Sequence, residues 1–254
     1  MFIDTHAHIY TEEFKTDIHD VILRAQDAGV EKILMPNIDT QTIDDMMELE
    51  VRYPNFCYAM MGLHPCSVKK DFEKQLYEVE DWLSKREFIA VGEMGTDLYW
   101  DKTFWDQQKE AFRIQSDLAI KYDLPIVIHC RETIDETIEL VEEKEGSLKG
   151  VFHCFTGDEN QAKKIVDLDF YLGLGGVSTF KNGGLNEVVP NLDTSKIVLE
   201  TDSPYLSPAP ERGKRNEPAK VSIIANKISE YLKKGVDEVA SFTTENANSL
   251  FFPK

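Results

Sequence analysis

The sequence predicts an α/β fold, a (β/α)8 TIM barrel formed as a single domain by residues 1–254, and two observations support it. Short apolar segments of β type alternate eight times with longer segments of helical periodicity, within a length that is ordinary for such a barrel. No linker rich in proline or serine and no shift in composition divides the chain. A doubly wound open sheet is the alternative, but it would place a glycine-rich phosphate turn where this sequence reads THAHIY.

The predicted strands are short, and several read as uninterrupted apolar runs. Such runs are typical of parallel strands that are buried on both faces. The strands are expected at residues 2–5, 32–36, 56–61, 88–92, 125–128, 150–152, 170–174 and 197–199.

Apolar residues recur at helical spacing between and after these strands. In the first such segment Ile18, Val21, Ile22 and Ala25 form one face, and Gly29 is suited to end the helix. Four further stripes predict helices in the same way: Phe72, Leu76, Val79 and Leu83; Ile134, Ile138 and Val141; Val221, Ile224, Ala225, Ile228 and Leu232; Val236, Val239, Ala240 and Thr243.

The charge balance and the cysteine pattern limit the classes of function. The chain has 28 Lys and Arg against 46 Asp and Glu, a net charge of −18, which argues against bulk attraction to duplex DNA or an anionic membrane. No apolar run approaches the length of a membrane span, and the beginning MFIDTHAHIY does not read as a signal peptide. The four cysteines form no CxxC pair. We therefore expect reduced thiols, a cytoplasmic protein and no membrane partner.

Chemistry-bearing residues follow the predicted strands. Active sites of (β/α)8 barrels are built at the C-terminal ends of the strands, and five of the six histidines lie there. The side chains expected at this end are those of His6, His8, His64, Glu93, His129, His153 and Asp202.

This set of residues predicts a metal site. His6 and His8 alternate with Ala7, so that both imidazoles would point into the barrel mouth. Four imidazoles and two carboxylates are too many for one catalytic ion but suit two divalent ions that share a bridging carboxylate. The alternative is a set of hydrogen-bonded core histidines with incidental acids, and convergence at one barrel face favours the metal.

Several motifs together resemble the TatD family of metal-dependent deoxyribonucleases, in the amidohydrolase-like barrel superfamily. They are DTHAH, GLHP, VGEMGTD, IVIHCRE, VFHCFTG, LETDSPYLSP and RGKRNEP. The resemblance implies that His6, His8 and Asp202 bind one metal ion and that His129 and His153 bind a second.

The resemblance also implies that Glu93 bridges the two ions and that His64 lies behind the ligands or on a substrate phosphate. Many relatives in the superfamily bridge their metals with a carboxylated lysine, but the predicted strand FIAVGE has no lysine, which favours Glu93. One departure from the family pattern occurs at residues 95–100, GTDLYW, where the family more often has glycine, leucine, aspartate and then tyrosines. We expect this loop to affect substrate preference.

The expected reaction is hydrolysis of DNA phosphodiester bonds, with exonuclease-like action on single strands or strand ends. Two ions about 3.5–4 Å apart would lower the pKa of a bridging water, and the resulting hydroxide would attack phosphorus. Asp202 is a candidate base as well as a ligand, which makes Glu93, Asp202 and His64 the candidate catalytic residues. Histidine ligands favour Zn²⁺, while phosphodiester chemistry favours Mg²⁺ or Mn²⁺. Glu200 could orient a ligand or accept an ordinary hydrogen bond.

Local positive charge is expected to bind the substrate in spite of the acidic balance. The candidate residues are Arg131, Lys181, Arg212, Lys214 and Arg215. Nearby aromatic residues could stack a base or pack at a helix start, and packing is favoured for Phe104: Tyr99, Trp100, Phe104 and Trp105.

Two other functions remain open. A binuclear hydrolase of a small phosphoester, amide or lactone would use the same metals, and the net charge favours it mildly. A non-catalytic barrel is disfavoured because every expected metal ligand is present.

Overall fold

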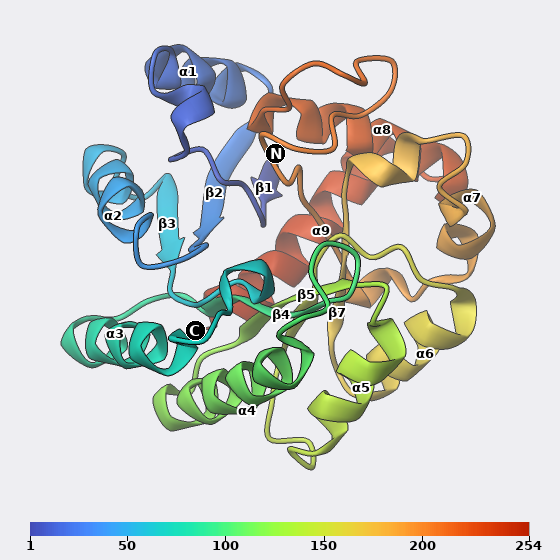
Figure 1. Ribbon diagram of the computed structural model, residues 1–254. Helices are drawn as coiled ribbons and strands as arrows, with labels where there is room; N and C mark the ends of the chain where they lie inside the picture. Colours follow the sequence, from blue (N-terminus) through green and yellow to red (C-terminus); the bar gives the residue numbers. More distant parts are fainter. Residues whose placement is uncertain (254) are drawn as a thin grey trace.

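Eight parallel strands form the predicted barrel in the computed structural model, which describes residues 1–253 (Figure 1). The apolar, β-branched residues of these short runs are buried on both faces of the sheet, as expected for parallel strands. The strands are β1 (Phe2–Asp4), β2 (Val30–Pro36), β3 (Cys57–Met60), β4 (Val91–Asp97), β5 (Ile126–Arg131), β6 (Gly150–Phe152), β7 (Tyr171–Leu174) and β8 (Ile197–Leu199).

The strands pair in sequence order, and two short contacts close the barrel. Continuous ladders join β1 to β3 and β4 to β8. An isolated bridge between Met61 and Val91 connects these two groups on one side, and a bridge between Ala7 and Ser203 connects them on the other. The backbone N–H of Thr5 also donates to the carbonyl of Leu199 at 3.0 Å. The C-terminal ends of all strands therefore surround one mouth.

The helices pack around the strands, and their apolar faces point inward. They are α1 (Ile18–Asp27), α2 (Ile43–Arg52), α3 (Phe72–Lys85), α4 (Trp105–Tyr122), α5 (Ile134–Glu142), α6 (Glu159–Asp167), α7 (Leu185–Val188), α8 (Val221–Leu232) and α9 (Val236–Phe251). Short 3₁₀ turns lie between them, at Glu12–Phe14, Pro65–Ser67, Gly176–Thr179, Val189–Asn191, Thr194–Lys196 and Pro218–Lys220. Within residues 1–253 no helix has the length and apolarity needed to cross a membrane.

Helix α9 lies across the end of the barrel opposite the mouth. A separate apolar cluster combines three of its side chains, Ala247, Leu250 and Phe251, with one residue from or beside most strands. The strand residues in this cluster are Ile3, Leu34, Met60, Ala90, Val127, Val151 and Val198. This packing seals the N-terminal end of the barrel, so that the opposite end is left for polar residues.

Strand β4 differs from its prediction. It was expected at 88–92, but it begins at Val91 and continues to Asp97, and all seven of its residues are buried. Because Glu93, Thr96 and Asp97 are polar, hydrophobicity alone ends the strand too early. Glu93 consequently lies inside β4 rather than at its end.

Three helices carry weaker sequence signals than the five that were predicted. Helix α2 buries Ile43, Met46 and Leu49 among acidic residues, and α6 buries only Ala162 and Ile165. Helix α4 buries polar as well as apolar side chains: Gln108, Ala111, Phe112, Gln115, Ser116, Leu118 and Ala119. Polar residues on the inner face hide the apolar stripe on which helix prediction depends.

Candidate metal centre

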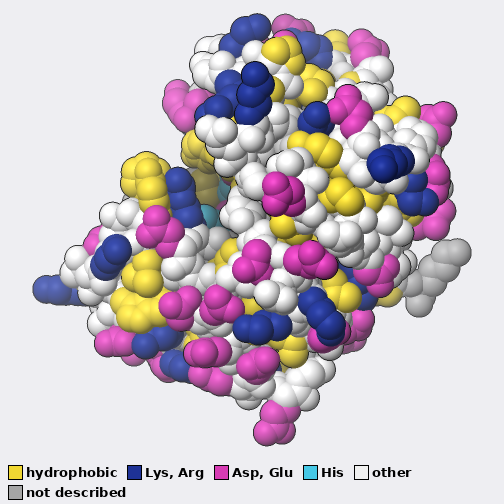
Figure 2. All heavy atoms as spheres, turned by 90° about the vertical axis from the view of Figure 1, so that its right-hand side faces the viewer, with side chains coloured by type: hydrophobic (Ala, Val, Ile, Leu, Met, Phe, Trp, Pro, Cys, Tyr) yellow, Lys and Arg dark blue, Asp and Glu magenta, His cyan; other side chains and the backbone are white. Residues whose placement is uncertain are grey.

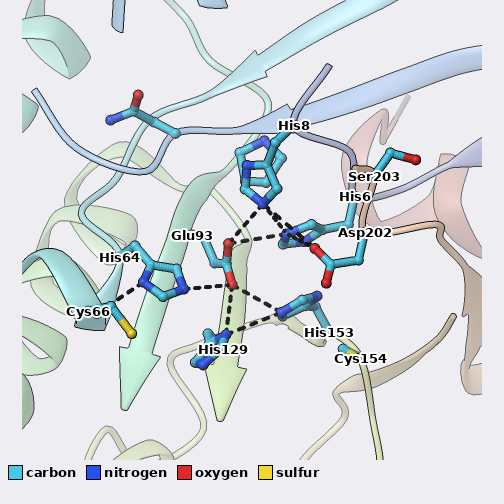
Figure 3. Close-up of polar contacts among 12 residues, drawn as sticks. His6, His8, His64, Cys66, Glu93, His129, His153, Cys154, Asp202 and Ser203 are labelled. Atoms are coloured by element: carbon cyan, nitrogen blue, oxygen red, sulfur yellow. Dashed lines mark hydrogen bonds and ion pairs between the residues drawn. The ribbon is translucent and has the colours of Figure 1, made fainter. Parts of the chain in front are cut away.

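The carboxylate of Glu93 lies at the centre of the polar cluster in the barrel mouth (Figure 3). Its Oε2 atom is 3.2 Å from His6 Nε2 and 3.4 Å from His8 Nε2. The Oδ1 atom of Asp202 is 3.8 Å from each of the same two nitrogens. Ligand atoms of His6, His8 and Glu93 lie within 4.8 Å of one another, as do those of His6, His153 and Asp202. Both sets have the spacing to bind a metal ion.

The other oxygen of Glu93 faces a second group of histidines. Its Oε1 atom is 3.0 Å from His129 Nδ1, 3.0 Å from His153 Nε2 and 3.4 Å from His64 Nε2. A single carboxylate that presents one oxygen to each of two imidazole groups has the geometry of a bridge between two ions. The bridging role of Glu93, which the family resemblance implies, stays a prediction.

The neighbours of His8 determine its tautomer, that is, which ring nitrogen carries the proton and which presents a lone pair to the cluster. The hydroxyl of Tyr10 donates to the carbonyl of Pro36 at 2.5 Å. The same hydroxyl lies 2.9 Å from His8 Nδ1 and must therefore accept a hydrogen bond from that nitrogen. The proton of His8 is thus assigned to Nδ1, and Nε2 is free to act as a ligand.

Carboxylates orient two further imidazoles in the same way. Asp97 Oδ2 lies 2.9 Å from His129 Nε2, and Glu200 Oε1 lies 3.2 Å from His153 Nδ1. Each carboxylate accepts a hydrogen bond from one ring nitrogen, which leaves the other nitrogen of the neutral ring free to bind a metal ion on the side of Glu93. Carboxylate–histidine pairs of this kind are typical of metal ligands, because they hold the ring and increase its basicity.

His64 has the opposite tautomer. Its Nδ1 accepts a hydrogen bond from the backbone N–H of Cys66 at 3.0 Å, which places the proton of the neutral ring on Nε2. This N–H group points toward Glu93 Oε1. In this tautomer His64 is a hydrogen-bond donor at the site, and its ring also lies within metal-ligand spacing of Glu93 and His129. Its predicted position behind the ligands or on a phosphate stays a prediction.

The donor set fits divalent cations. The atoms that converge are imidazole nitrogens and carboxylate oxygens, which are the donor types that coordinate divalent cations in proteins. Burial opposes the charge of Glu93, yet His64, His153 and His6 hold the pKa of its carboxyl well below the usual range. Burial raises the pKa of Asp202 to about 6. The bridge is thus an anion, while Asp202 can change protonation near neutral pH.

Asp202 is held in place by contacts between the ends of β8 and β1. The residue has a positive φ of 57°, and its N–H donates to the carbonyl of His6 at 2.8 Å. The preceding Thr201 donates its N–H and its hydroxyl to Asp4 at 2.8 and 2.6 Å. Asn216 donates to the carbonyl of Thr201 at 2.6 Å. The bond from Asn216 to Thr201 joins the motif RGKRNEP to the motif LETDSP and helps to hold Asp202 in position.

A cavity of about 620 Å³ opens above the cluster, and Figure 2 shows histidine in a hollow flanked by hydrophobic and basic side chains. Of the seven predicted residues, His6 does not line the cavity. The other six do: His8, His64, Glu93, His129, His153 and Asp202. The rim includes Trp100, Arg131, Tyr205 and Leu206. A cavity of this size can admit a nucleotide or another small substrate.

The predicted basic residues differ in their positions. Arg131 lines the cavity, whereas Arg212 lies over the ring of Phe180 at 4.1 Å and Lys214 lies 3.9 Å from a carboxylate oxygen of Glu211. Lys181 is exposed and is not among the residues that line this cavity.

Arg215 is engaged elsewhere in the fold. It forms two hydrogen bonds with Asp17, at 2.7 and 2.8 Å, and lies 4.5 Å from the ring of Phe14. Its guanidinium therefore anchors the loop after β8 to the N-terminal segment. The sequence alone does not show that Asp17 is within reach.

Two residues that orient the candidate ligands were not predicted from the sequence, and the role of a third was left open. Asp97 and Tyr10 were not identified, and the role of Glu200 was undecided. A usable signal exists for Asp97, which lies four residues after Glu93 on β4, because this spacing in extended backbone places side chains on the same face. Tyr10 lies in a turn, and its contact with His8 does not follow from strand alternation.

Comparison with known proteins agrees with this geometry. The profile of a family described as TatD related DNase matches residues 3–252. The uncharacterized metal-dependent hydrolase YabD of Bacillus subtilis is 40% identical over 253 residues, 99% of each chain, and the 3'-5' ssDNA/RNA exonuclease TatD of Salmonella typhimurium is 30% identical over 98% of each. The crystal structure of YjjV, a TatD homologue from Escherichia coli, superimposes with a TM-score of 0.93 at 30% identity, over 98% of this chain and 97% of that one. The chain belongs to the TatD-related DNase family.

Proposed function

We propose that the protein is a divalent-metal-dependent hydrolase that cleaves phosphodiester bonds of DNA, with exonuclease-like action on single-stranded ends. The observation that carries this proposal is the two-sided environment of Glu93, whose oxygens each face a separate imidazole group. Two ions, Mg²⁺, Mn²⁺ or Zn²⁺, would lower the pKa of an attacking water and stabilise charge on the phosphate oxygens. The name of the Salmonella relative supports a single-stranded nucleic acid as substrate.

In this scheme each residue of the chain has a defined role. His6, His8 and Asp202 would hold one ion and His129 and His153 the other, with Glu93 between them. The carboxylate of Asp202, which faces His6 and His8, is the candidate to accept a proton from the attacking water.

His64 and Arg131 would act on the substrate itself. The Nε2–H group of His64 points into the site, where it can donate to a phosphate oxygen and stabilise charge that develops during attack. Arg131 at the rim supplies positive charge for a neighbouring phosphate.

The test uses single strands labelled at either the 3' or the 5' end, with the protein first chelated and then refilled with one divalent ion at a time. We expect stepwise shortening from one end, no cleavage after chelation, and recovery with added metal. His129→Ala should lose most of the activity and one bound ion. Equal activity on closed circles would exclude end-dependence, and full activity of chelated enzyme or of His129→Ala would contradict the metal scheme.

A small phosphoester, amide or lactone remains a second candidate substrate. Among the described residues that line the cavity, Arg131 is the one Lys or Arg, in a chain with a net charge of −18. A panel of these substrates and oligonucleotides at fixed metal concentration would rank them by kcat/KM.

A further inference from the structure

Two exposed aromatic rings, packed edge to face, and one arginine lie together at the rim of the cavity. Tyr99 is 49% exposed and Trp100 is 68% exposed, with their ring centroids 5.0 Å apart. The guanidinium of Arg131 lies 3.7 Å from the centroid of Tyr99 and 5.5 Å from that of Trp100. We call these three residues the aromatic platform. The guanidinium packs closely on the ring of Tyr99 and less closely on that of Trp100, and most of the Trp100 side chain is exposed to solvent.

The platform is fixed to the barrel by hydrogen bonds. Asp97 Oδ1 accepts the backbone N–H groups of both Tyr99 and Trp100, at 2.8 and 2.9 Å. The N–H of Leu98 donates to the carbonyl of Arg131 at 3.1 Å. A turn held in this way loses little conformational entropy when a ligand binds to it.

The same aspartate connects the platform to the candidate metal centre. While its Oδ1 atom holds the turn, its Oδ2 atom accepts from His129 Nε2 at 2.9 Å. Arg131 follows His129 by two residues on β5, about 7 Å further along the strand. A ligand on the platform would therefore lie within about one nucleotide of the ions.

The chemistry of the platform indicates its ligand. An exposed indole offers an apolar face that water solvates poorly, and bases stack well on such a face. Within residues 1–253 no carboxylate pairs with Arg131, so its N–H groups are available for an anion. The aromatic ring can stack on a base while the unpaired arginine beside it binds the phosphate of the same nucleotide.

We propose that the aromatic platform binds the terminal nucleotide of the substrate, with the base stacked on Trp100 and a phosphate held by Arg131. This inference rests on the proposed function, since it identifies which part of a nucleic acid the site recognises. Stacking requires a base that is free of its neighbours, and the platform therefore selects unpaired ends over duplex.

The test measures binding of probes the size of a reaction product, which contain no phosphodiester bond. Metal-loaded protein is titrated in a calorimeter with deoxyadenosine monophosphate and, separately, with deoxyribose 5-phosphate, which lacks the base. We expect the wild type to bind the nucleotide about 5- to 150-fold more tightly, the range measured for one base stacked on an aromatic side chain. Trp100→Ala should reduce this ratio to less than about threefold while binding of the sugar phosphate stays unchanged.

Matched controls separate the two halves of the platform. Tyr77→Ala removes an aromatic ring of similar exposure, 72%, from the remote helix α3 and should leave the ratio intact. Arg131→Gln should weaken both probes alike, by about tenfold or more, whereas Lys74→Gln removes one exposed charge from α3 without effect.

The inference fails if the wild type binds neither probe or does not distinguish them, or if Trp100→Ala keeps the full preference for the nucleotide. Failure of the proposed function looks different. If the wild type prefers the nucleotide and this preference depends on Trp100, but no oligonucleotide is cleaved, the role of the aromatic platform is supported and the proposed nuclease activity is contradicted.

Discussion

At the scale of single residues, the function of each histidine depends on the partner of its second nitrogen. His129 and His153 each donate a hydrogen bond to a carboxylate, and His8 donates one to Tyr10. His64 instead accepts from a backbone N–H group. These contacts separate His8, His129 and His153, whose neutral rings each keep one nitrogen free for a metal ion, from His64, whose Nε2 carries the proton.

The two orienting carboxylates differ in how many of their oxygens are used. Asp97 uses both, one for the turn and one for His129. Glu200 uses Oε1 for His153 and for the N–H of Cys154, while its Oε2 is buried without a partner. An amide has one accepting oxygen, so it can replace Glu200 better than Asp97.

We therefore predict that Asp97→Asn weakens metal binding by about 10- to 100-fold and that Glu200→Gln has a smaller effect. The measurement is calorimetric titration of chelated protein with Mn²⁺ or Zn²⁺. An equal or larger loss in Glu200→Gln would show that charge, rather than the number of accepted bonds, decides ligand orientation.

A second prediction concerns His64. His64→Asn keeps an acceptor for the Cys66 N–H, but its shorter side chain does not carry an N–H donor to the position of His64 Nε2, so we expect kcat to fall by about 100-fold or more. Bound metal, counted after dialysis, should match the wild type. Loss of an ion would identify His64 as a ligand, and unchanged turnover would exclude its contact with the reacting phosphate.

Residue spacing in the sequence predicts much of this cluster but not all of it. His6, His8, His129, His153 and Asp202 follow recognisable strands, and their meeting follows from barrel geometry. Asp97 was missed because the predicted strand ended at residue 92, before its buried polar part. Arg215 pairs with Asp17, a residue far away in the sequence, and local sequence does not reveal this contact.

At the scale of elements, buried polar side chains on helix α4 position the loop that carries His64. Gln115 is 1% exposed; its Oε1 accepts from the N–H of Leu63 at 2.8 Å, and its Nε2 donates to the carbonyl of Leu63 at 3.2 Å. This pairing imitates a strand contact and fixes the residue that precedes His64. It also explains why α4 lacks a clear apolar stripe.

Gln115→Leu keeps the volume of the side chain but leaves both backbone groups of Leu63 unpaired. We predict a loss of about 1–3 kcal/mol in the free energy of unfolding, measured by urea titration. Gln26→Leu, at an exposed position of α1, is the matched control and should change stability little. A stability of Gln115→Leu equal to that of the control would mean that water replaces the lost bonds.

The junction of β1 and β8 depends on a buried acid. Asp4 is fully buried, accepts two hydrogen bonds from Thr201, and has its pKa raised to about 8 by burial. Because the folded state binds this proton more tightly than the unfolded chain, its stabilising effect is complete below the unfolded pKa of 3.8 and is lost as the pH rises through 8.

Asp4→Asn removes this titration and retains a polar partner for Thr201. With chelator present, we predict that the unfolding free energy of the wild type falls relative to that of the variant from about pH 5 to pH 8, by up to about 1.36 kcal/mol per pH unit. Urea titrations at several pH values give the difference in unfolding free energy between the two proteins. Contributions from the titration of all other acids are common to both proteins and cancel in this difference. A difference that does not change with pH would contradict the raised pKa.

The elements themselves were predicted unevenly for physical reasons. Strands buried on both faces form apolar runs that the sequence makes visible, and those at 150–152 and 197–199 have the predicted bounds. Helices α2, α4 and α6 were missed because acidic or amide side chains interrupt their inner faces.

At the scale of the whole molecule, the barrel separates stability from chemistry. Helix α9 and an apolar layer close one end, and a cluster rich in charge occupies the other. Glu93 and Asp202 concentrate negative charge in the mouth of a protein that is already acidic, and divalent cations would offset it. We therefore expect affinity for nucleic acid to depend on the bound ions rather than on a basic surface.

The most direct test of the account is the number of divalent ions that the chelated, refilled protein retains per chain, measured together with that of Glu93→Gln. We predict two ions in the wild type and a loss of at least one in the variant, because an amide cannot offer an anionic oxygen to both imidazole groups. A single ion in the wild type, or two ions retained at unchanged affinity in Glu93→Gln, would contradict the bridging role of Glu93.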